Sequence, residues 1–328
     1  MNLSLPVCKQ PQPLISFTGG INTGSINFKS HKEKVVIVMG ATGTGKSKLS
    51  IDLATHVPAE IINSDKMQVY KGLDIVTNKV TEEECRGVPH HLLRIVDPDA
   101  DYTATDFRQH ALLAIESIIE QDKLPIIAGG SNSFIESLVN DDPYFASRYE
   151  CCFLWVDVSL PILHRFVSKR VDQMVEAGLV EEVKALFDHQ SDYTRGIRRA
   201  IGVPELDTFL RAQGYTNLDP ETLDTLLQEA VDQIKENTYK LACRQLQKIH
   251  RLRDFWGWNL HRIDATEAFL HQGKEANKAW ERLVVDPSAM ILAQFLYRSR
   301  GGALSKPHGR AMIPRTVSPM AAMAAATH

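Results

Sequence analysis

The sequence predicts an α/β fold: a mainly parallel sheet with helices on both faces, and additional helices in the second half of the chain. Two observations predict it. Short runs of apolar, often β-branched residues alternate with longer segments of helical periodicity, and glycine-rich turns follow two of these runs. Runs without polar alternation are typical of strands that are buried on both faces. Their alternation with helices implies parallel strands joined by crossover helices.

The first strand–helix unit and the second strand lie near the start of the pattern. VVIVM at 35–39 is a continuous apolar run, and the glycine-rich turn after it leads into a helix over 46–56. This helix carries apolar residues on one side, and Pro58 follows its end, as expected of a residue that cannot continue a helix. AEIIN at 59–63 is the second expected strand.

The remaining elements follow from the same two signals. A helix is expected over 104–121, where apolar residues occupy one face. The apolar runs 125–130 and 153–159 predict a third and a fourth strand. Two further helices are expected over 172–188 and 221–251, the latter with apolar residues at spacings of 4, 3, 4 and 7.

The composition is that of an ordinary globular protein. The chain has 328 residues, of which 44% are hydrophobic and 23% charged, enough for one large domain or two small ones. A net charge of −3 argues against a generally basic nucleic-acid-binding protein. No apolar run reaches the about 18 residues of a transmembrane helix. The five cysteines form no C-x-x-C pair, which favours free thiols over disulfides or a zinc site.

The two ends of the chain differ from its middle. The first 32 residues contain no Asp or Glu and several Ser and Thr. This is the composition of an organellar transit peptide, and the lack of arginine favours a plastid. We therefore expect a plastid transit peptide or a disordered leader over 1–33, and one functional domain over 34–290. A flexible basic tail is expected over 291–328, where glycine, proline and basic residues accumulate.

The most specific motif follows the first strand. GATGTGKS fits the pattern G-x-x-x-x-G-K-[ST] completely, and it lies between a strand and a helix, as this motif requires. In such a P-loop, backbone N–H groups converge on phosphate oxygens at the positive end of the helix, and the Ser can ligate Mg²⁺. The motif predicts a P-loop NTPase-like three-layer fold, with a phosphate site formed by Gly40, Ala41, Thr42, Gly43, Thr44, Gly45, Lys46 and Ser47.

A carboxylate, Asp65, follows the second strand. Because the carboxyl ends of parallel strands form one crevice, Asp65 should face the P-loop. There it could ligate Mg²⁺, accept a proton or cap the next turn. The third strand ends in glycines rather than in the acid with which hydrolytic P-loop enzymes position Mg²⁺. This weakens the NTPase interpretation, although Asp157 at the end of the fourth strand could substitute.

Further candidates for phosphate or nucleotide binding lie outside the P-loop. Arg198 and Arg199 belong to a short basic segment, and Arg244 lies in the last long helix. Arginine suits bidentate phosphate contact, but a solvated basic turn explains the segment equally well. Ser131 and Asn132, directly after the third strand, are also candidates.

Seven blocks in this order resemble the isopentenyltransferase family, and together they span most of residues 34–255. The blocks are 40–47, 63–80, 88–107, 126–138, 170–187, 197–206 and 239–252. The family transfers a dimethylallyl group from dimethylallyl diphosphate to the N6 amino group of adenine. One branch acts on tRNA, and another acts on free AMP, ADP or ATP to make cytokinins in plants.

The resemblance implies roles for particular residues. Asp65 would be the general base that takes the adenine N6 proton. Thr42 would contact the diphosphate near the breaking C–O bond, with Lys46 on phosphate oxygens and Ser47 on Mg²⁺. Arg199 matches a family arginine that binds the diphosphate, and the doubled arginine leaves the choice between Arg199 and Arg198 open.

Three features resemble the free-nucleotide branch. The long helical insertion by which tRNA-modifying relatives grip the anticodon stem is absent after the glycine-rich block 126–138, no cysteine follows Cys243 to build a zinc finger, and the net charge is negative. We therefore expect dimethylallyl diphosphate and AMP, ADP or ATP as substrates, no tRNA and no membrane. The expected location is the plastid stroma, or alternatively the cytoplasm. Rival interpretations are a tRNA dimethylallyltransferase, a small-molecule kinase that uses the P-loop for ATP, and a non-catalytic nucleotide-binding module.

Overall fold

The computed structural model describes residues 32–190, 192–214 and 219–297. Nearly all of the expected leader and residues 298–328 of the expected tail lie outside the described residues.

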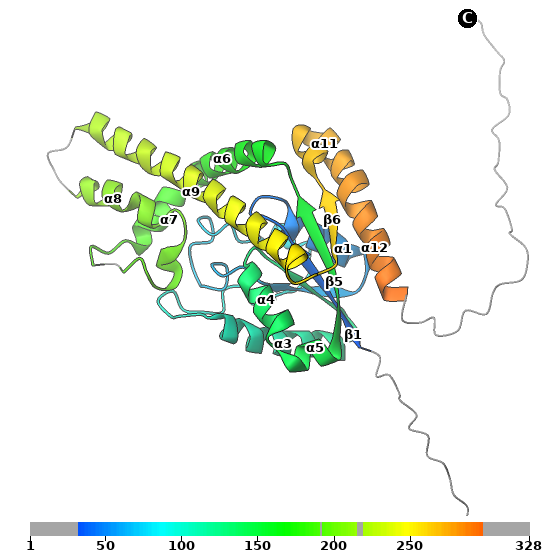
Figure 1. Ribbon diagram of the computed structural model, residues 1–328. Helices are drawn as coiled ribbons and strands as arrows, with labels where there is room; N and C mark the ends of the chain where they lie inside the picture. The colour runs from blue at the N-terminus through cyan, green and yellow to red at the C-terminus, as the bar shows by residue number, and fades with distance from the viewer. Residues whose placement is uncertain (1–31, 191, 215–218, 298–328) are drawn as a thin grey trace, which may run out of the picture. The chain divides into compact units, whose positions relative to one another are not determined.

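One parallel sheet forms the centre of the described part of the chain (Figure 1). Its strands are β1 (Glu33–Met39), β2 (Ala59–Asn63), β3 (His90–His91), β4 (Leu124–Ala128), β5 (Tyr149–Asp157) and β6 (Leu260–Asp264). They are ordered β3-β2-β4-β1-β5-β6, and every neighbouring pair is parallel. The four strands expected from the sequence are the central four, and β3 and β6 extend the sheet at its two edges.

Helices make up most of the remaining described residues. They are α1 (Lys46–His56), α2 (Glu82–Cys85), α3 (Ala104–Glu120), α4 (Asn132–Asn140), α5 (Pro143–Arg148), α6 (Leu160–Glu176), α7 (Leu179–Leu186), α8 (Asp207–Gln213), α9 (Pro220–Asp254), α10 (Thr266–Leu270), α11 (Gly273–Trp280) and α12 (Asp286–Tyr297). Short 3₁₀ turns cover Gly196–Arg199 and Pro204–Leu206, and a π-helical turn covers Glu281–Val285. No helix within these ranges is long and apolar enough to cross a membrane.

Two apolar layers cover the two faces of the sheet. Along β1, the side chains of Val35, Ile37 and Met39 belong to one layer, and those of Val36 and Val38 belong to the other. Helices α3, α4 and α9 contribute to the first layer, whereas α1, α11 and α12 contribute to the second. Burial on both faces explains why the β1 sequence is apolar without alternation. The predicted three-layer α/β arrangement is confirmed.

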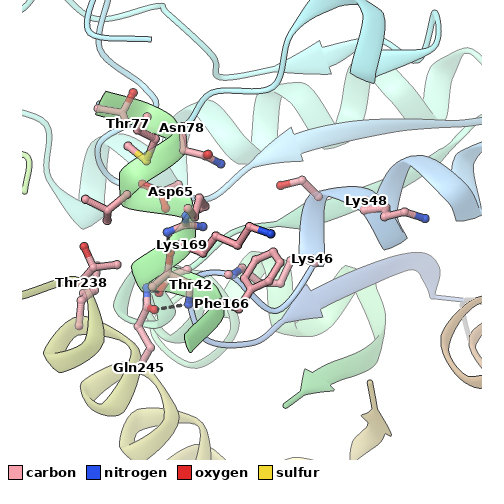
Figure 2. Close-up of a pocket in the computed structure, with 18 of the residues that line it drawn as sticks. Thr42, Lys46, Lys48, Asp65, Thr77, Asn78, Phe166, Lys169, Thr238 and Gln245 are labelled. Atoms are coloured by element: carbon pink, nitrogen blue, oxygen red, sulfur yellow. Dashed lines mark hydrogen bonds between the residues drawn. The ribbon is translucent and has the colours of Figure 1, made fainter. Parts of the chain in front are cut away.

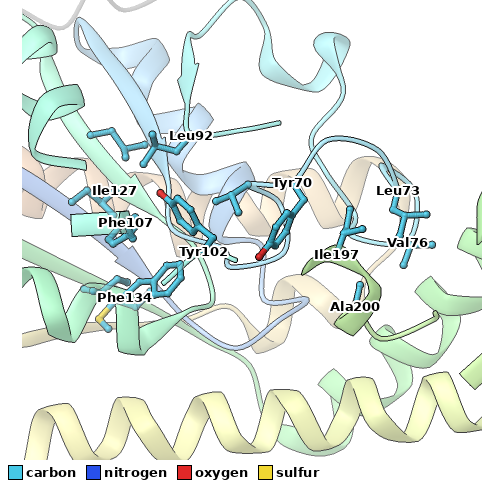
Figure 3. Close-up of a cluster of buried hydrophobic side chains, with 14 of the residues drawn as sticks. Tyr70, Leu73, Val76, Leu92, Tyr102, Phe107, Ile127, Phe134, Ile197 and Ala200 are labelled. Atoms are coloured by element: carbon cyan, nitrogen blue, oxygen red, sulfur yellow. The ribbon is translucent and has the colours of Figure 1, made fainter. Parts of the chain in front are cut away.

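A cluster in the first layer holds the chain after β2 against the turn before α8 (Figure 3). Tyr70 and Ile197 are fully buried there, and Phe107 stacks on Phe134 with 4.9 Å between ring centroids. The Ile197 N–H donates a hydrogen bond to the Pro98 carbonyl oxygen (2.7 Å). This packing fixes the position of the Gly196–Arg199 turn.

Two predictions about the second half of the chain are wrong. The helix expected over 172–188 is interrupted: α6 ends at Glu176 and α7 begins at Leu179, because Gly178 between them has a φ of 102°. Residues 291–297 of the expected tail are helical, because they belong to α12, which continues to Tyr297. Its residue Leu292 is buried in the second apolar layer, which a solvated tail would not provide.

Candidate active site

A cavity of about 1250 Å³ lies where the carboxyl ends of β1, β2 and β4 meet. Its wall includes the P-loop, the residues directly after β2 and β4, one side of α6, part of α9 and the segment from Ala268 to Trp280. Figure 2 shows Thr42, Lys46 and Asp65 around this cavity, together with Lys169 of α6 and Gln245 of α9. Parallel strands place their carboxyl ends at one edge of the sheet, and that is why these segments converge.

The P-loop forms part of the cavity wall and contributes its lysine, Lys46, to it. Lys46 is only 9% exposed, and its Nζ donates to the Ala41 carbonyl oxygen (2.7 Å). Burial lowers the pKa of Lys46 to about 8; the nearby Asp65 carboxylate opposes this shift, and the Arg170 guanidinium adds to it. A lysine in this state gains from a bound anion, because an anion replaces the water that burial has removed.

Asp65 lines the same cavity, close enough to Lys46 and Arg170 for its carboxylate to raise the pKa of both. Its backbone N–H donates to Asn63 Oδ1 (3.0 Å), and its own Oδ1 accepts the Met67 N–H (2.9 Å). The second carboxylate oxygen, Oδ2, accepts no hydrogen bond from the described residues. One oxygen therefore fixes the side chain, and the other is available to a ligand. The turn-capping and proton-accepting interpretations of Asp65 are compatible.

Arg170 on α6 completes the cationic side of the cavity, and the sequence-based reasoning missed it. Its Nη2 donates to Thr42 Oγ1 (3.1 Å), whereas its Nε is buried and has no partner among the described residues. Burial lowers the pKa of Arg170, and the Asp65 carboxylate raises it. A buried guanidinium with an unsatisfied N–H is costly unless an anion binds there.

A sequence signal for Arg170 was available. Leu163 and Val167 are buried on α6, and Arg170 follows them at spacings of 7 and 3. Residues at these spacings share one face of a helix. An arginine on an otherwise apolar stripe points to a buried anion site, but the helix predicted from the sequence began only at residue 172, after Arg170.

Gln245 of α9 joins the P-loop to the glycine-rich turn after β4. Its Oε1 accepts the Thr42 N–H (2.7 Å), and its Nε2 donates to the Gly130 carbonyl oxygen (2.9 Å). A Cβ added at position 130 would lie 2.4 Å from Gln245 Nε2, so a larger residue there would displace the glutamine side chain from this position. The sequence-based reasoning had named the neighbouring Arg244 instead; Arg244 also lines the cavity, but its side chain is exposed.

The structure separates the two candidate arginines of the Gly196–Arg199 turn. Arg199 lines the cavity, and its Nη2 donates to the Tyr70 hydroxyl (3.3 Å). Arg198 does not line the cavity, and it forms an ion pair with Asp99. Proximity to Arg199 also contributes to the lowered pKa of Lys66, after burial. The position of Arg198 therefore does not support the predicted role in anion binding.

The other predicted residues also divide into those that line the cavity and those that do not. Gly43, Gly45, Ser47 and Ser131 line the cavity with Thr42 and Lys46, whereas Gly40, Ala41, Thr44 and Asn132 do not. Ser131 Oγ accepts the Lys66 N–H (2.8 Å). Asn132 is buried, and its Nδ2 donates to the Gln245 backbone oxygen (3.1 Å). Asn132 therefore supports α9, and its position does not favour the predicted contact with nucleotide.

The residues present fit Mg²⁺ only as an ion carried by phosphate. In the described ranges, no group of three or more His, Cys, Asp or Glu residues could hold a metal, and Cys85, Cys151, Cys152 and Cys243 are free. Ser47 is exposed in the cavity wall, and its hydroxyl makes no hydrogen bond within the described part of the chain. Mg²⁺ commonly takes one or two protein ligands and obtains the rest from phosphates and water. The substitute acid Asp157 is bound to Arg262 (2.7 Å) and lies outside the cavity wall.

Chemically, the cavity combines an anion site with a single well-placed base. The P-loop, Lys46, Arg170 and Arg199 can bind phosphate oxygens. Asp65 and Glu84 are the two carboxylates among the described residues of the wall, and Glu84 is engaged in capping α2. Apolar side chains also line the cavity; they include Met67, Val76, Met174, Ile201, Ile234 and Leu241.

Comparisons with known proteins show which proteins this chain resembles. A family described as IPP transferase matches residues 68–147 and 140–251. Adenylate isopentenyltransferase 5, chloroplastic, of Arabidopsis thaliana is 62% identical over 87% of this chain and 86% of its own length. Adenylate isopentenyltransferase 7, mitochondrial, of the same plant is 54% identical, with 90% of each chain covered. A eukaryotic dimethylallyltransferase acting on tRNA shares the fold, with a TM-score of 0.69, 24% identity, and coverage of 81% of this chain and 80% of its own.

Proposed function

This chain belongs to the IPP transferase family, and we propose that it transfers the dimethylallyl group of dimethylallyl diphosphate to N6 of the adenine of AMP, ADP or ATP. The products are diphosphate and an N6-prenylated nucleotide, the first step of cytokinin synthesis. The observation that carries the proposal is the placement of Asp65 in one cavity with Lys46 and Arg170.

The cationic side of the cavity suits the leaving group. When the allylic C–O bond breaks, its electron pair goes to the diphosphate, and positive charge spreads over the allyl unit. Lys46 and Arg170 stabilise the developing negative charge from fixed positions, which costs no reorganisation during the reaction. The Thr42 hydroxyl accepts a hydrogen bond from Arg170, so its own hydrogen is directed elsewhere and can be donated to the departing oxygen.

Asp65 suits the acceptor. The lone pair of the adenine amine is delocalised into the ring, so the amine is a weak nucleophile. The new bond joins N6 to the allylic carbon, and Asp65 Oδ2 takes the N6 proton as that bond forms. Met67 N–H holds the other oxygen (2.9 Å), which keeps Oδ2 oriented. The apolar side chains of the cavity wall can exclude water from the allyl cation.

Mg²⁺ would be held by Ser47 and by the diphosphate oxygens, and when bound it supplies further charge neutralisation for the leaving group. This chain's own contribution at that point is the Ser47 hydroxyl at the start of α1, where it faces the cavity.

We propose a free nucleotide, not tRNA, as the acceptor. The segment between α4 and β5 consists of the short helix α5 and its flanking residues, so the chain has no helical insertion there to grip an RNA stem. The curated relatives that are 62% and 54% identical to this chain are named adenylate isopentenyltransferases. The tRNA-acting neighbour is more distant, at 24% identity.

We also propose plastid targeting by the leader. One of these relatives is named chloroplastic and the other mitochondrial. The composition of residues 1–32 favours the plastid, because the segment contains no arginine. Imaging of a fluorescent fusion to residues 1–40 tests this: plastid import supports it, and mitochondrial or cytoplasmic fluorescence contradicts it.

A competition experiment tests the acceptor. Purified protein receives dimethylallyl diphosphate, Mg²⁺, and equal concentrations of AMP, ADP, ATP and an anticodon stem–loop RNA, and the products are separated by mass spectrometry. We expect prenylated free nucleotides and unmodified RNA. Substantial prenylation of the RNA would overturn the acceptor assignment while leaving the donor chemistry intact.

A further inference from the structure

Trp280, at the end of α11, lies against the P-loop although it is 235 positions away from Gly45 in the sequence. The side chain is 5% exposed, and the same residue forms part of the cavity wall with Gly45, Lys46 and Ser47. It also lies outside the residues that match the family description, which end at 251. None of the catalytic steps above uses it.

The indole N–H of Trp280 is bound to the helix that carries the P-loop lysine. Trp280 Nε1 donates to Asp52 Oδ2 (2.8 Å), and this hydrogen bond is buried. Asp52 lies on α1 and also pairs with Lys48 (3.2 Å) and with Arg86. These partners outweigh burial and hold the pKa of Asp52 below its usual value, with the Trp280 hydrogen bond among the largest causes. Trp280 therefore donates to a charged, fixed acceptor.

The six-membered ring of Trp280 covers Gly45. A Cβ added to Gly45 would lie 2.5 Å from Trp280 Cη2 and 2.9 Å from Cζ3, so the ring leaves room for glycine only. Gly45 has a φ of 90°, a backbone conformation that is energetically unfavourable for any residue with a side chain. No side chain caps the helix that begins after it. The Lys48 ammonium lies 4.6 Å from the ring centroid on the adjacent turn.

The segment after Trp280 is buried as well. The π-helical turn Glu281–Val285 follows directly, and Val284 and Val285 are almost completely buried in the second apolar layer. Such single π-turns are frequent at functional sites, where they re-aim neighbouring side chains. Trp280 is thus held from the C-terminal side and contacts both Gly45 and Asp52.

From these contacts we infer that Trp280 is a positioning residue for the donor. It fixes the Gly45 peptide and the first turn of α1, so that the P-loop is already in its anion-binding conformation when the diphosphate arrives. Helix α11 is therefore part of the donor site. The inference rests on the proposed function insofar as the P-loop must bind the donor's diphosphate.

Trp280→Phe tests the inference with an aromatic side chain kept at this position. Phenylalanine lacks both the N–H that reaches Asp52 and the outer ring atoms that cover Gly45. Trp256→Phe is the matched control, because Trp256 also donates its indole N–H to a carboxylate, Glu136 (2.9 Å), but lies outside the cavity wall. The probe is inorganic diphosphate with Mg²⁺, measured by calorimetry, together with steady-state kinetics.

For Trp280→Phe we expect the Kd of diphosphate and the KM of the donor to rise together, by on the order of 10-fold, since preorganisation is lost. In Trp280→Phe, the KM of the nucleotide should match that of the parent protein. In Trp256→Phe, the thermal midpoint should match that of the parent protein. Equal diphosphate affinity in the parent and in Trp280→Phe would overturn the inference. Failure of the parent protein to bind diphosphate at all would refute the proposed function on which the inference depends.

A second pair of variants keeps the test valid if Trp280→Phe does not fold. Asp52→Ala removes the acceptor of the indole N–H and leaves the ring in place, whereas Asp52→Asn keeps an acceptor oxygen. We expect weaker diphosphate binding in Asp52→Ala and substantial recovery in Asp52→Asn. Unchanged binding in Asp52→Ala would contradict a positioning role that acts through this hydrogen bond.

Discussion

Replacing Asp65 by asparagine should abolish most turnover and leave the fold and the donor site intact. Asparagine keeps an Oδ1 that can accept the Met67 N–H, so the turn after β2 is retained. The change is confined to Oδ2, which becomes an amide NH₂ group that cannot accept a proton. The substitution therefore removes the proposed base without creating a cavity or an unpaired backbone group.

The size of the effect follows from the role of Oδ2. A positioned general base contributes about 10²–10⁴-fold to a rate, which corresponds to about 3–5 kcal/mol of activation free energy. We therefore expect kcat to fall by roughly that factor. The loss of the Asp65 charge also removes an influence that raises the pKa of Lys46, so this pKa should fall further below about 8. The assay should be run at pH 7 or below, so that Lys46 stays charged as far as possible.

The assay is single-turnover prenylation of ATP, with inorganic diphosphate binding as the control for the donor site. Asp157→Asn is the matched carboxylate control, because Asp157 also lies at the end of a strand but is bound to Arg262 outside the cavity wall. Diphosphate affinity should be unchanged or higher in Asp65→Asn. A rate within about threefold of the parent protein would refute general-base catalysis by Asp65.

Three further predictions rest on single contacts. Because the pKa of Lys46 is about 8, its positive charge is lost as the pH rises through that value. Diphosphate affinity measured by calorimetry should therefore fall about 10-fold between pH 7 and 9. Lys46→Arg should flatten this profile, and an equal fall in both proteins would assign the effect to other groups. Arg170→Gln should lower kcat/KM for the donor by about 10²–10³-fold in steady-state assays, and a preserved value would show that its buried Nε has no ligand. Glu60 binds His91 and Lys123, and these bonds hold its pKa below 4.5 against the effect of burial. Its contribution to the free energy of unfolding is therefore complete above pH about 4.5 and is lost as the pH falls through the folded-state pKa, so Glu60→Gln should lose stability less steeply than the parent protein in acid denaturation; identical slopes would contradict this.

The sequence predicted the centre of the fold because its signals there are local. The strand over 35–39 is apolar on both faces, and the helix over 104–121 has a regular apolar stripe; both were found within two residues at each end. The edge strands were missed for physical reasons. His90–His91 is only two residues long, and β6 reads L-H-R-I-D, in which pairing with β5 decides the conformation.

The candidate site was predictable where its functional residues lie in short contiguous motifs. The P-loop motif and the carboxylate after β2 gave Thr42, Lys46 and Asp65, because parallel topology brings these segments to one edge. The contributions of Arg170, Gln245 and Trp280 depend on how α6, α9 and α11 pack over that edge. Nothing local to the sequence distinguishes Gln245 from Arg244 before the packing of α9 is known.

The fate of the acceptor's phosphates tests the central claim most directly, namely that the P-loop holds the donor's diphosphate and not the phosphates of ATP. Phosphorus NMR can follow a mixture of the protein, Mg²⁺, ATP and dimethylallyl diphosphate. We predict one inorganic diphosphate for each prenylated nucleotide formed, with the triphosphate chain intact in the product. The appearance of ADP while the donor remains unconsumed would contradict the account and would indicate a phosphoryl-transfer enzyme.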